Sequence, residues 1–198
     1  MRPIPFLSEA RRSQLSPPER ADIAILRKME PAIRSKLGYW TGKIGNLADE
    51  PPLRAFAAGC FAIGVFGGHA RLRRAALRML AAHTLATAVK TVGKNNIDRS
   101  RPMALLDDKR YLMASGHSHE AALQSFPSGH TAGSVAVAHG FTQEYPRHGA
   151  AAYGVAATLG FLQIFRRAHF PGDVLAGAVV GMAAGAIADA LLTPILGE

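Results

Sequence analysis

The sequence predicts an all-α protein, an integral membrane helix bundle of about five short transmembrane helices with an N-terminal amphipathic helix before them. The first observation is composition: 48% of the 198 residues are hydrophobic and only 19% are charged. This balance excludes a disordered chain, a collagen and a coiled coil. The second is patterning, because apolar runs nearly free of charge recur after residue 53. We expect two parts, an N-terminal interfacial segment over 1–52 and a helical domain over 53–198.

The N-terminal segment carries an amphipathic stripe. Apolar residues recur at helical intervals from Leu26 to Leu47, and most lysines and arginines fall off that stripe. A helix lying in the lipid headgroup layer has this pattern, with Tyr39 and Trp40 as interfacial anchors. A helix packed on the protein has it too, so both remain open. Pro31 predicts a break or kink.

The helical domain is predicted from five apolar runs, which cover 55–70, 75–92, 132–145, 153–165 and 174–196. A membrane span needs about 20 apolar residues, so the last run is long enough by itself and the others are marginal. Buried helices of an alanine-rich soluble bundle are the alternative. Gly177, Gly181 and Gly185 repeat every four residues in the last run, a pattern that lets two helices approach closely.

The charge and the single cysteine narrow the function classes. A formal net charge of +9 favours an anionic partner such as nucleic acid, anionic lipid or a phosphate ester. The apolar runs argue against nucleic acid. Cys60 is the only cysteine, which excludes an internal disulfide and a cysteine-based zinc site. His117 and His119 are too few for a metal site, and nothing in the pattern indicates the oligomeric state.

Three polar links between the apolar runs carry the reactive residue types. Lys94, Arg99 and Arg101 in the first link supply cations that suit phosphate oxygens. In the second, Pro127 is suited to begin a helix, which would leave the amides of 128–130 free to bind an anion. In the third, an aspartate four residues after His169 can fix the tautomer of that imidazole for nucleophilic attack.

Together the three links resemble the type 2 phosphatidic acid phosphatase superfamily, which includes bacterial acid phosphatases and vanadium haloperoxidases. Its first signature places a lysine before Arg-Pro, as Lys94 stands before Arg101-Pro102. Its second is Pro-Ser-Gly-His, present in full at 127–130. Its third ends in a histidine and an aspartate, matched by His169 and Asp173. The resemblance covers roughly 55–195.

The third signature departs from the family at one position. The family arginine belongs six residues before the histidine, where this chain has Gln163. Arg166 and Arg167 follow one turn later on the same helix face, and we predict that Arg167 reaches the same phosphate oxygens. In the first signature Lys90 is the alternative to Lys94, which strict spacing favours.

The resemblance implies a mechanism and a substrate class. His169 would attack phosphorus to form a phosphohistidine, Asp173 would orient it, and His130 would protonate the leaving oxygen. The phosphoryl oxygens would be held by Lys94, Arg101, Ser128, Gly129 and Arg167 without a required cofactor or metal. The implied substrate is a lipid phosphate or diphosphate monoester such as phosphatidate, phosphatidylglycerophosphate or a polyprenyl diphosphate. The alternative is an impaired relative that binds phospholipid headgroups without hydrolysing them, because Gln163 replaces the arginine.

The expected location is a membrane, namely a bacterial inner membrane. With five crossings, the N-terminal segment and the three links share one face, which carries most of the lysines and arginines. The positive-inside rule points that face to the cytoplasm. The resemblance implies the periplasmic face instead, so the face stays open.

Overall fold

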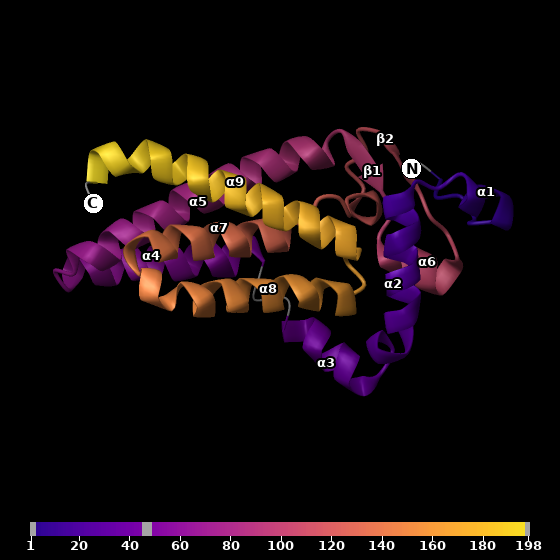
Figure 1. Cartoon of the computed structure of the whole chain (residues 1–198), viewed down its shortest axis with the longest axis horizontal. Helices are drawn as coiled ribbons and strands as arrows, with labels where there is room; N and C mark the ends of the chain where they lie inside the picture. Colours follow the sequence, from indigo (N-terminus) through magenta and orange to yellow (C-terminus); the bar gives the residue numbers. More distant parts are fainter. Residues whose placement is uncertain (1–2, 45–48, 197–198) are drawn as a thin grey trace.

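Five long helices run side by side and make up most of the protein (Figure 1). The computed structural model describes residues 3–44 and 49–196, so Leu47 of the predicted stripe lies outside the described residues. Each predicted apolar run falls largely within one helix. These helices are α4 (Glu50–Phe66), α5 (Ala70–Lys94), α7 (Gly129–Glu144), α8 (Gly149–Phe165) and α9 (Pro171–Leu196).

The centre of the bundle is made of α5, α7 and α9, which meet through small side chains. Six buried alanines form one core cluster, two from each helix: Ala82, Ala86, Ala132, Ala136, Ala184 and Ala188. The glycine stripe of α9 faces α7, because a Cβ on Gly177 would lie 2.4 Å from the carbonyl oxygen of Ser128. A Cβ on Gly181 would lie 2.5 Å from the carbonyl oxygen of Ala132. The predicted close approach of helices is therefore confirmed.

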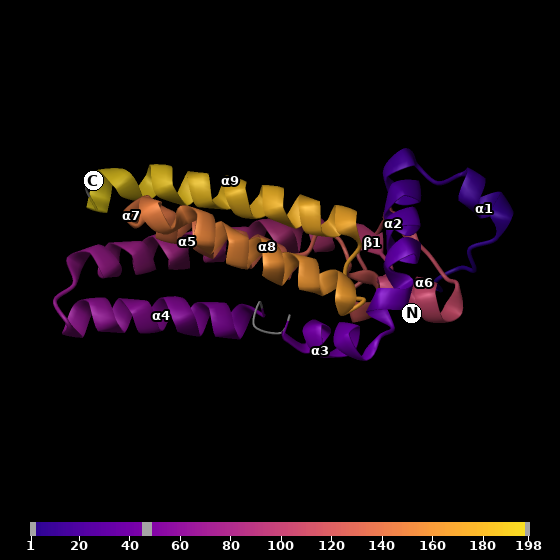
Figure 2. The ribbon, with the colours of Figure 1, turned by 60° about the horizontal axis from the view of Figure 1, so that its bottom comes forward.

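The N-terminal segment folds over one end of the bundle (Figure 2). It contains α1 (Glu9–Ser13), α2 (Pro17–Ile33) and α3 (Lys36–Ile44). Pro31 lies in the last turn of α2, and the helix ends two residues later. Leu26 and Ile33 of the stripe are buried in a cluster with Phe170, so this part packs on the protein. Tyr39 and Trp40 on α3 are exposed at 59% and 62%.

Two short strands correct the all-α prediction. Strand β1 (Ile97–Arg99) pairs antiparallel with β2 (Met113–Ser115), and the short helix α6 (Pro102–Asp108) lies between them. Two single-turn 3₁₀ helices cover Ala121–Leu123 and Pro146–His148. A strand of three residues is too short to show a period in the sequence. The strand pair fixes the first polar link beside the end of the bundle.

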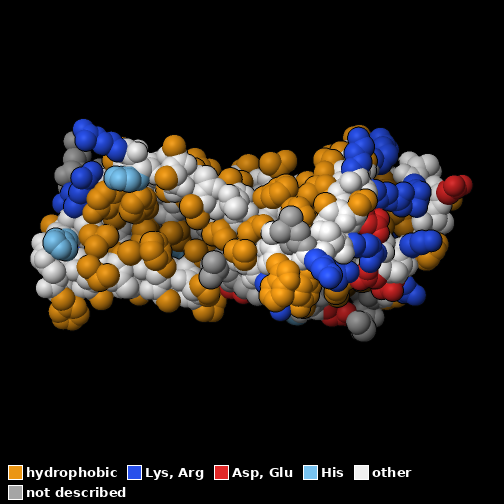
Figure 3. Space-filling model, turned by 90° about the horizontal axis from the view of Figure 1, so that it is seen from below, with side chains coloured by type: hydrophobic (Ala, Val, Ile, Leu, Met, Phe, Trp, Pro, Cys, Tyr) orange, Lys and Arg blue, Asp and Glu red, His pale blue; other side chains and the backbone are white. Residues whose placement is uncertain are grey.

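Membrane crossing is supported by length and composition for a single helix. Among the described residues, only α9 is both long and apolar enough to span a bilayer. Five transmembrane helices therefore remain a prediction. The surface is nonetheless strongly divided, since hydrophobic side chains cover much of the bundle face in Figure 3 and Lys and Arg gather toward its two ends.

Candidate active site

The bundle end under α2 brings the three polar links together. Lys94 ends α5, His130 lies in the first turn of α7, and His169 lies in the turn between α8 and α9. The two imidazole rings meet edge to face with centroids 5.6 Å apart. Links separated by more than 70 residues of sequence therefore form one cluster.

The His169 ring is held in one orientation by a backbone group. Its Nδ1 lies 2.7 Å from the carbonyl oxygen of Ser125, and because a carbonyl only accepts, Nδ1 carries the proton. The side chain is 0% exposed. Its Nε2 is buried with no hydrogen-bond partner among the described residues. This tautomer leaves a lone pair on Nε2, the atom that a nucleophile needs.

Asp173 supports this orientation indirectly, which corrects the predicted direct hydrogen bond. Its Oδ2 is 3.9 Å from Nδ1 of His169, too long for a hydrogen bond. The same oxygen accepts from the hydroxyl of Ser125 at 2.6 Å and from the amide of Phe170 at 2.8 Å. Asp173 thus holds Ser125 and Phe170, the residue that follows His169. The Ser125 carbonyl in turn holds the ring.

A buried ion-pair network anchors Asp173 to the N-terminal segment. Arg99 donates to Asp173 and, at 2.7 Å, to Asp22 of α2. Arg99 is 2% exposed, and its guanidinium lies 4.4 Å from the Phe170 ring centroid. The sequence suggested Arg99 as a phosphate ligand, but its donors are directed at these two carboxylates.

Asp22 also reaches the start of α9. It accepts from the amide of Gly172 at 2.6 Å, and a Cβ on Gly172 would lie 2.6 Å from a carboxylate oxygen of Asp22. Only a glycine allows so close an approach at this position. The free amide at the helix N-terminus favours the negative charge. Asp22 therefore ties α2, β1 and α9 into one rigid support behind His169.

The charge state of His169 suits attack. Burial, and next the neighbouring His130 and Lys94, lower the pKa of His169 well below its ordinary value of 6.5. Desolvation and nearby positive charge both disfavour the imidazolium. His169 is therefore neutral at physiological pH, with Nε2 unprotonated.

His130 is held from its other side by a carboxylate. Nε2 of His130 lies 2.5 Å from Oδ1 of Asp49 and 3.2 Å from Nη1 of Arg166. Nδ1 of His130 is buried without a partner among the described residues. Because a carboxylate only accepts, Nε2 carries a proton, and Arg166 lies beside it as a positive charge and not as a donor. Nδ1 is therefore the nitrogen available for proton transfer.

The predicted anion cradle falls at the start of α7, which begins at Gly129 with Ser128 as its N-cap and not at Pro127 as predicted. The Ser128 amide donates to the carbonyl of Asp173 at 3.0 Å, so it is not free as predicted. The Ser128 hydroxyl caps α7 and accepts from the hydroxyl of Thr131 at 3.0 Å. Gly129 faces Lys90, because a Cβ at Gly129 would lie 2.8 Å from that lysine's Cδ.

A polar cavity opens in front of this cradle. It has a volume of about 570 Å³ and is lined by Asp49, Glu50, Pro51, Arg54, Lys90, Lys94, Gly129 and His130. Both candidate lysines line it, and Lys90 forms an ion pair with Glu50. Arg101 is close enough to Arg166 to respond to its charge, since burial and then Arg166 lower the pKa of Arg101.

The prediction for Arg167 is corrected by the geometry. Its backbone adopts a positive φ of 56°, and its guanidinium pairs with Asp107 at 2.9 Å. Arg166 is the arginine that turns toward the histidines. Its Nη1 lies beside His130 and donates to Oε1 of Gln163 at 3.0 Å. The fully buried Gln163 thus orients a neighbouring arginine from the position where the family has its own.

Three supporting residues could not be found from the sequence. Ser125 acts through a backbone carbonyl, which has no sequence signature. Asp22 and Asp49 precede the signature region and lie next to it only after folding. No group of three or more His, Cys, Asp or Glu that could hold a metal ion occurs in the described part of the chain.

Comparison with known proteins finds a matching family and a similar fold. The sequence model of the PAP2 superfamily, the type 2 phosphatidic acid phosphatases, matches residues 75–192, more than half of the chain. The crystal structure of LpxE from Aquifex aeolicus superposes with a TM-score of 0.61 and 22% identity. That match covers 84% of this chain and 93% of the other, and it shows a shared fold.

Curated relatives match over a shorter stretch. A lipid A 1-phosphatase of Rhizobium johnstonii is 38% identical over 90 residues, 44% of this chain and 36% of its own length. A lipid A 1-phosphatase of Porphyromonas gingivalis is 35% identical over 104 residues, 48% of this chain and 23% of its own length. The match thus spans about a third or less of these relatives.

Proposed function

Since this chain belongs to the PAP2 superfamily, we propose that it is a membrane lipid phosphatase that hydrolyses a phosphate or diphosphate monoester through a phosphohistidine intermediate. The observation that carries the proposal is the His169 tautomer. Nδ1 is committed to the Ser125 carbonyl at 2.7 Å, and the unprotonated Nε2 has no hydrogen-bond partner in the part of the chain that the structure describes. Among candidate lipids, lipid A is the first choice because the curated relatives are lipid A 1-phosphatases.

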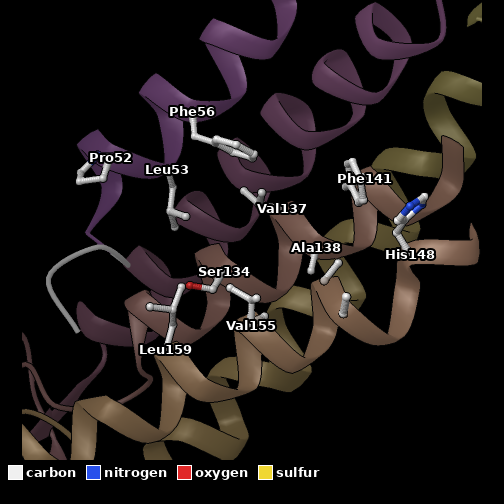
Figure 4. A pocket seen from close by; sticks show the side chains of 13 residues that line it. Pro52, Leu53, Phe56, Ser134, Val137, Ala138, Phe141, His148, Val155 and Leu159 are labelled. Carbon is white, nitrogen blue, oxygen red and sulfur yellow. The ribbon is translucent and has the colours of Figure 1, made fainter. Parts of the chain in front are cut away.

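An apolar groove next to the polar cavity supports a lipid substrate. The groove has a volume of about 570 Å³ and runs between α4, α7 and α8, lined mainly by aliphatic and aromatic side chains such as Leu53, Phe56, Val155 and Leu159 (Figure 4). The groove adjoins the polar cavity along α4 and α7. Pro52 lines the groove and Pro51 lines the cavity. Such a groove suits an acyl chain whose phosphate reaches the histidines.

The exposed surface of the bundle supports placement in a membrane. Large apolar side chains point outward from three of the long helices: Phe56, Ile63, Phe66, Val155, Phe161, Leu175, Val179, Ile187, Leu191 and Ile195. Contiguous exposure on this scale marks a surface that meets lipid or another protein. We propose the bacterial inner membrane, with the interfacial segment 1–52 at the headgroups. The N-terminal charges point the active site to the cytoplasm, and the family resemblance to the periplasm.

In the first step, Nε2 of His169 attacks phosphorus as the ester P–O bond breaks. The leaving oxygen takes a proton from Nδ1 of His130. Burial and the charge of Arg166 lower the pKa of His130 to about 4 and Asp49 opposes them, so the protonated ring that donates is the minor form at neutral pH. Lys94, Arg101 and Arg166, together with the Gly129 amide and the Ser128 hydroxyl, hold the phosphoryl oxygens. Lys90 lines the same cavity as Lys94. The products of this step are the dephosphorylated lipid and phosphohistidine.

In the second step, water attacks the phosphohistidine. Nδ1 of His130, now unprotonated, takes one proton from that water as the P–N bond breaks. His169 returns to its neutral form with the lone pair on Nε2, and inorganic phosphate leaves. Asp173 keeps the ring in place in both steps through Ser125. These groups need no metal ion or other cofactor for the proposed chemistry.

The decisive experiment measures phosphate release by the detergent-purified protein, with and without EDTA, from lipid A, phosphatidate, phosphatidylglycerophosphate and a polyprenyl diphosphate. We expect wild type to turn over at least one of these lipids and His169→Ala to release none. His119→Ala is the matched control, because His119 is exposed in a loop. Rapid acid-free quenching with a ³²P-labelled substrate should trap label on wild type and not on His169→Ala.

Silence of the folded wild type on every lipid would overturn the enzyme and favour the alternative reading. That alternative is a relative that binds phospholipid headgroups without hydrolysing them, favoured by Gln163 at the arginine position. Turnover that persists in His169→Ala would overturn the phosphohistidine mechanism alone.

A further inference from the structure

A second cavity lies behind the active site, between the N-terminal segment and the end of α8. It has a volume of about 410 Å³. Its wall is formed by Ile33, Arg34, Ser35, Tyr39, Gly42, Lys43, Phe165, Arg166 and Arg167. Gly42 of α3 faces α8, since a Cβ there would lie 3.4 Å, an ordinary contact distance, from the backbone of Phe165 and Arg166. The cavity therefore forms only where the two regions of the chain meet.

Among the residues that the structure describes, four cations and no carboxylate line this cavity. Arg34 and Arg167 share Asp107, at 3.3 Å and 2.9 Å, and Arg34 also pairs with Glu30. These carboxylates are not part of the cavity wall. A wall that presents guanidinium and ammonium groups, with the acids behind it, attracts an anion.

Lys43 differs from the arginines in having aromatic neighbours. Its ammonium lies 4.8 Å from the Tyr39 ring centroid and 5.0 Å from that of Trp40. Cation–π contacts hold an ammonium in place while leaving its positive charge uncompensated. Lys43 can therefore donate to an anion that enters the cavity.

Arg166 connects this cavity to the catalytic cluster. The same guanidinium lines the cavity and places Nη1 3.2 Å from Nε2 of His130. We propose that the cavity is a second anion site, which binds a phosphate group other than the one being hydrolysed. That group is either a second phosphate of the same lipid or the headgroup of a neighbouring anionic lipid. The inference deepens the proposed function and rests on it for the identity of the ligand.

The test compares two lipids in binding measurements that need no turnover. One is lipid A carrying a single phosphate, the other lipid A carrying two. Equilibrium dissociation constants are measured in neutral detergent for the full-length chain in a His169→Ala background that prevents turnover, with position 43 as wild type, Lys43→Gln or Lys43→Arg. Lys36→Gln is the matched control, since Lys36 is an exposed lysine on the same helix that does not line the cavity.

We expect wild type to bind the doubly phosphorylated lipid more tightly, and Lys43→Gln to lose about tenfold of that preference. Lys43→Arg should keep most of it, and Lys36→Gln should keep all of it. A second arm adds phosphatidylglycerol to the micelles. If the effect of Lys43→Gln appears only then, the ligand is a neighbouring headgroup.

Equal behaviour of Lys43→Gln and Lys36→Gln in both arms would overturn the second anion site. Failure of the proposed function is separate, because it appears as absent phosphate release while these binding constants remain measurable. If the protein prefers the doubly phosphorylated lipid but wild type releases no phosphate from any lipid, the second anion site stands and the proposed phosphatase activity is wrong.

Discussion

Two buried arginines, Arg99 and Arg78, are set in similar surroundings at opposite ends of the bundle. Arg99 is 2% exposed and lies between Asp22 and Asp173. Arg78 is 4% exposed and lies between Glu144 and Asp189. Each arginine thus joins a carboxylate of α9 to one from another helix. The two networks have the same chemistry and lie toward opposite ends of α9.

The difference lies in what the carboxylates touch next. Asp173 accepts from Ser125, whose carbonyl orients His169. Glu144 accepts from Arg74 at 2.9 Å, so its further contacts only tie helices together. A buried ion pair is thus not in itself a sign of function. The Arg99 network positions a nucleophile, and the Arg78 network joins α5, α7 and α9.

The largest expected effect is that of Arg99→Met. It leaves two carboxylates buried without their cation, which costs about 3–5 kcal/mol of unfolding free energy, and it abolishes phosphate release. Arg78→Met should cost less, because Glu144 keeps Arg74. Thermal unfolding in detergent and phosphate release on the same samples check both. An Arg99→Met protein with wild-type turnover would contradict the positioning role.

A subtler comparison uses Asp22→Asn and Glu144→Gln, which remove charge and keep shape. Asp22→Asn weakens the support behind Ser125, so kcat should fall about tenfold while KM stays near wild type. Glu144→Gln should lower the unfolding temperature and leave kcat unchanged. Asp22→Glu tests for rescue, and we expect poor rescue because Gly172 leaves no space. Equal kcat values for the two amide variants would remove the distinction between the networks.

The sequence predicted the helices well because their signal is long-ranged and repetitive. Runs of apolar residues located α4, α5, α7, α8 and α9, and the glycines of α9 indicated its close contact with α7. The strands β1 and β2 were missed, since three residues carry no period.

The site was predicted in part, and the misses share one cause. The three signatures located His130, His169 and Asp173 beside one another, but spacing alone suggested a direct bond between the last two. The structure places the Ser125 carbonyl there instead, at 2.7 Å. Helix spacing likewise suggested Arg167, whereas the helix ends at Phe165 and Arg166 turns toward His130. Local spacing cannot indicate backbone partners or the turn that follows a helix.

The smallest effect concerns the protonation of His169 itself. Its lowered pKa means that the ring stays neutral as pH falls through 6.5 and takes up its proton only at more acidic pH. Ring ¹⁵N chemical shifts of labelled protein, assigned with His169→Ala, report both the charge and the tautomer. We expect a neutral ring with the proton on Nδ1 at pH values below 6.5, where an ordinary imidazole is already protonated. A proton on Nε2 would show that the Arg99 network does not prepare this nucleophile, and titration at the ordinary value of 6.5 would show that burial does not keep the ring neutral. The two buried arginines would then differ only in location.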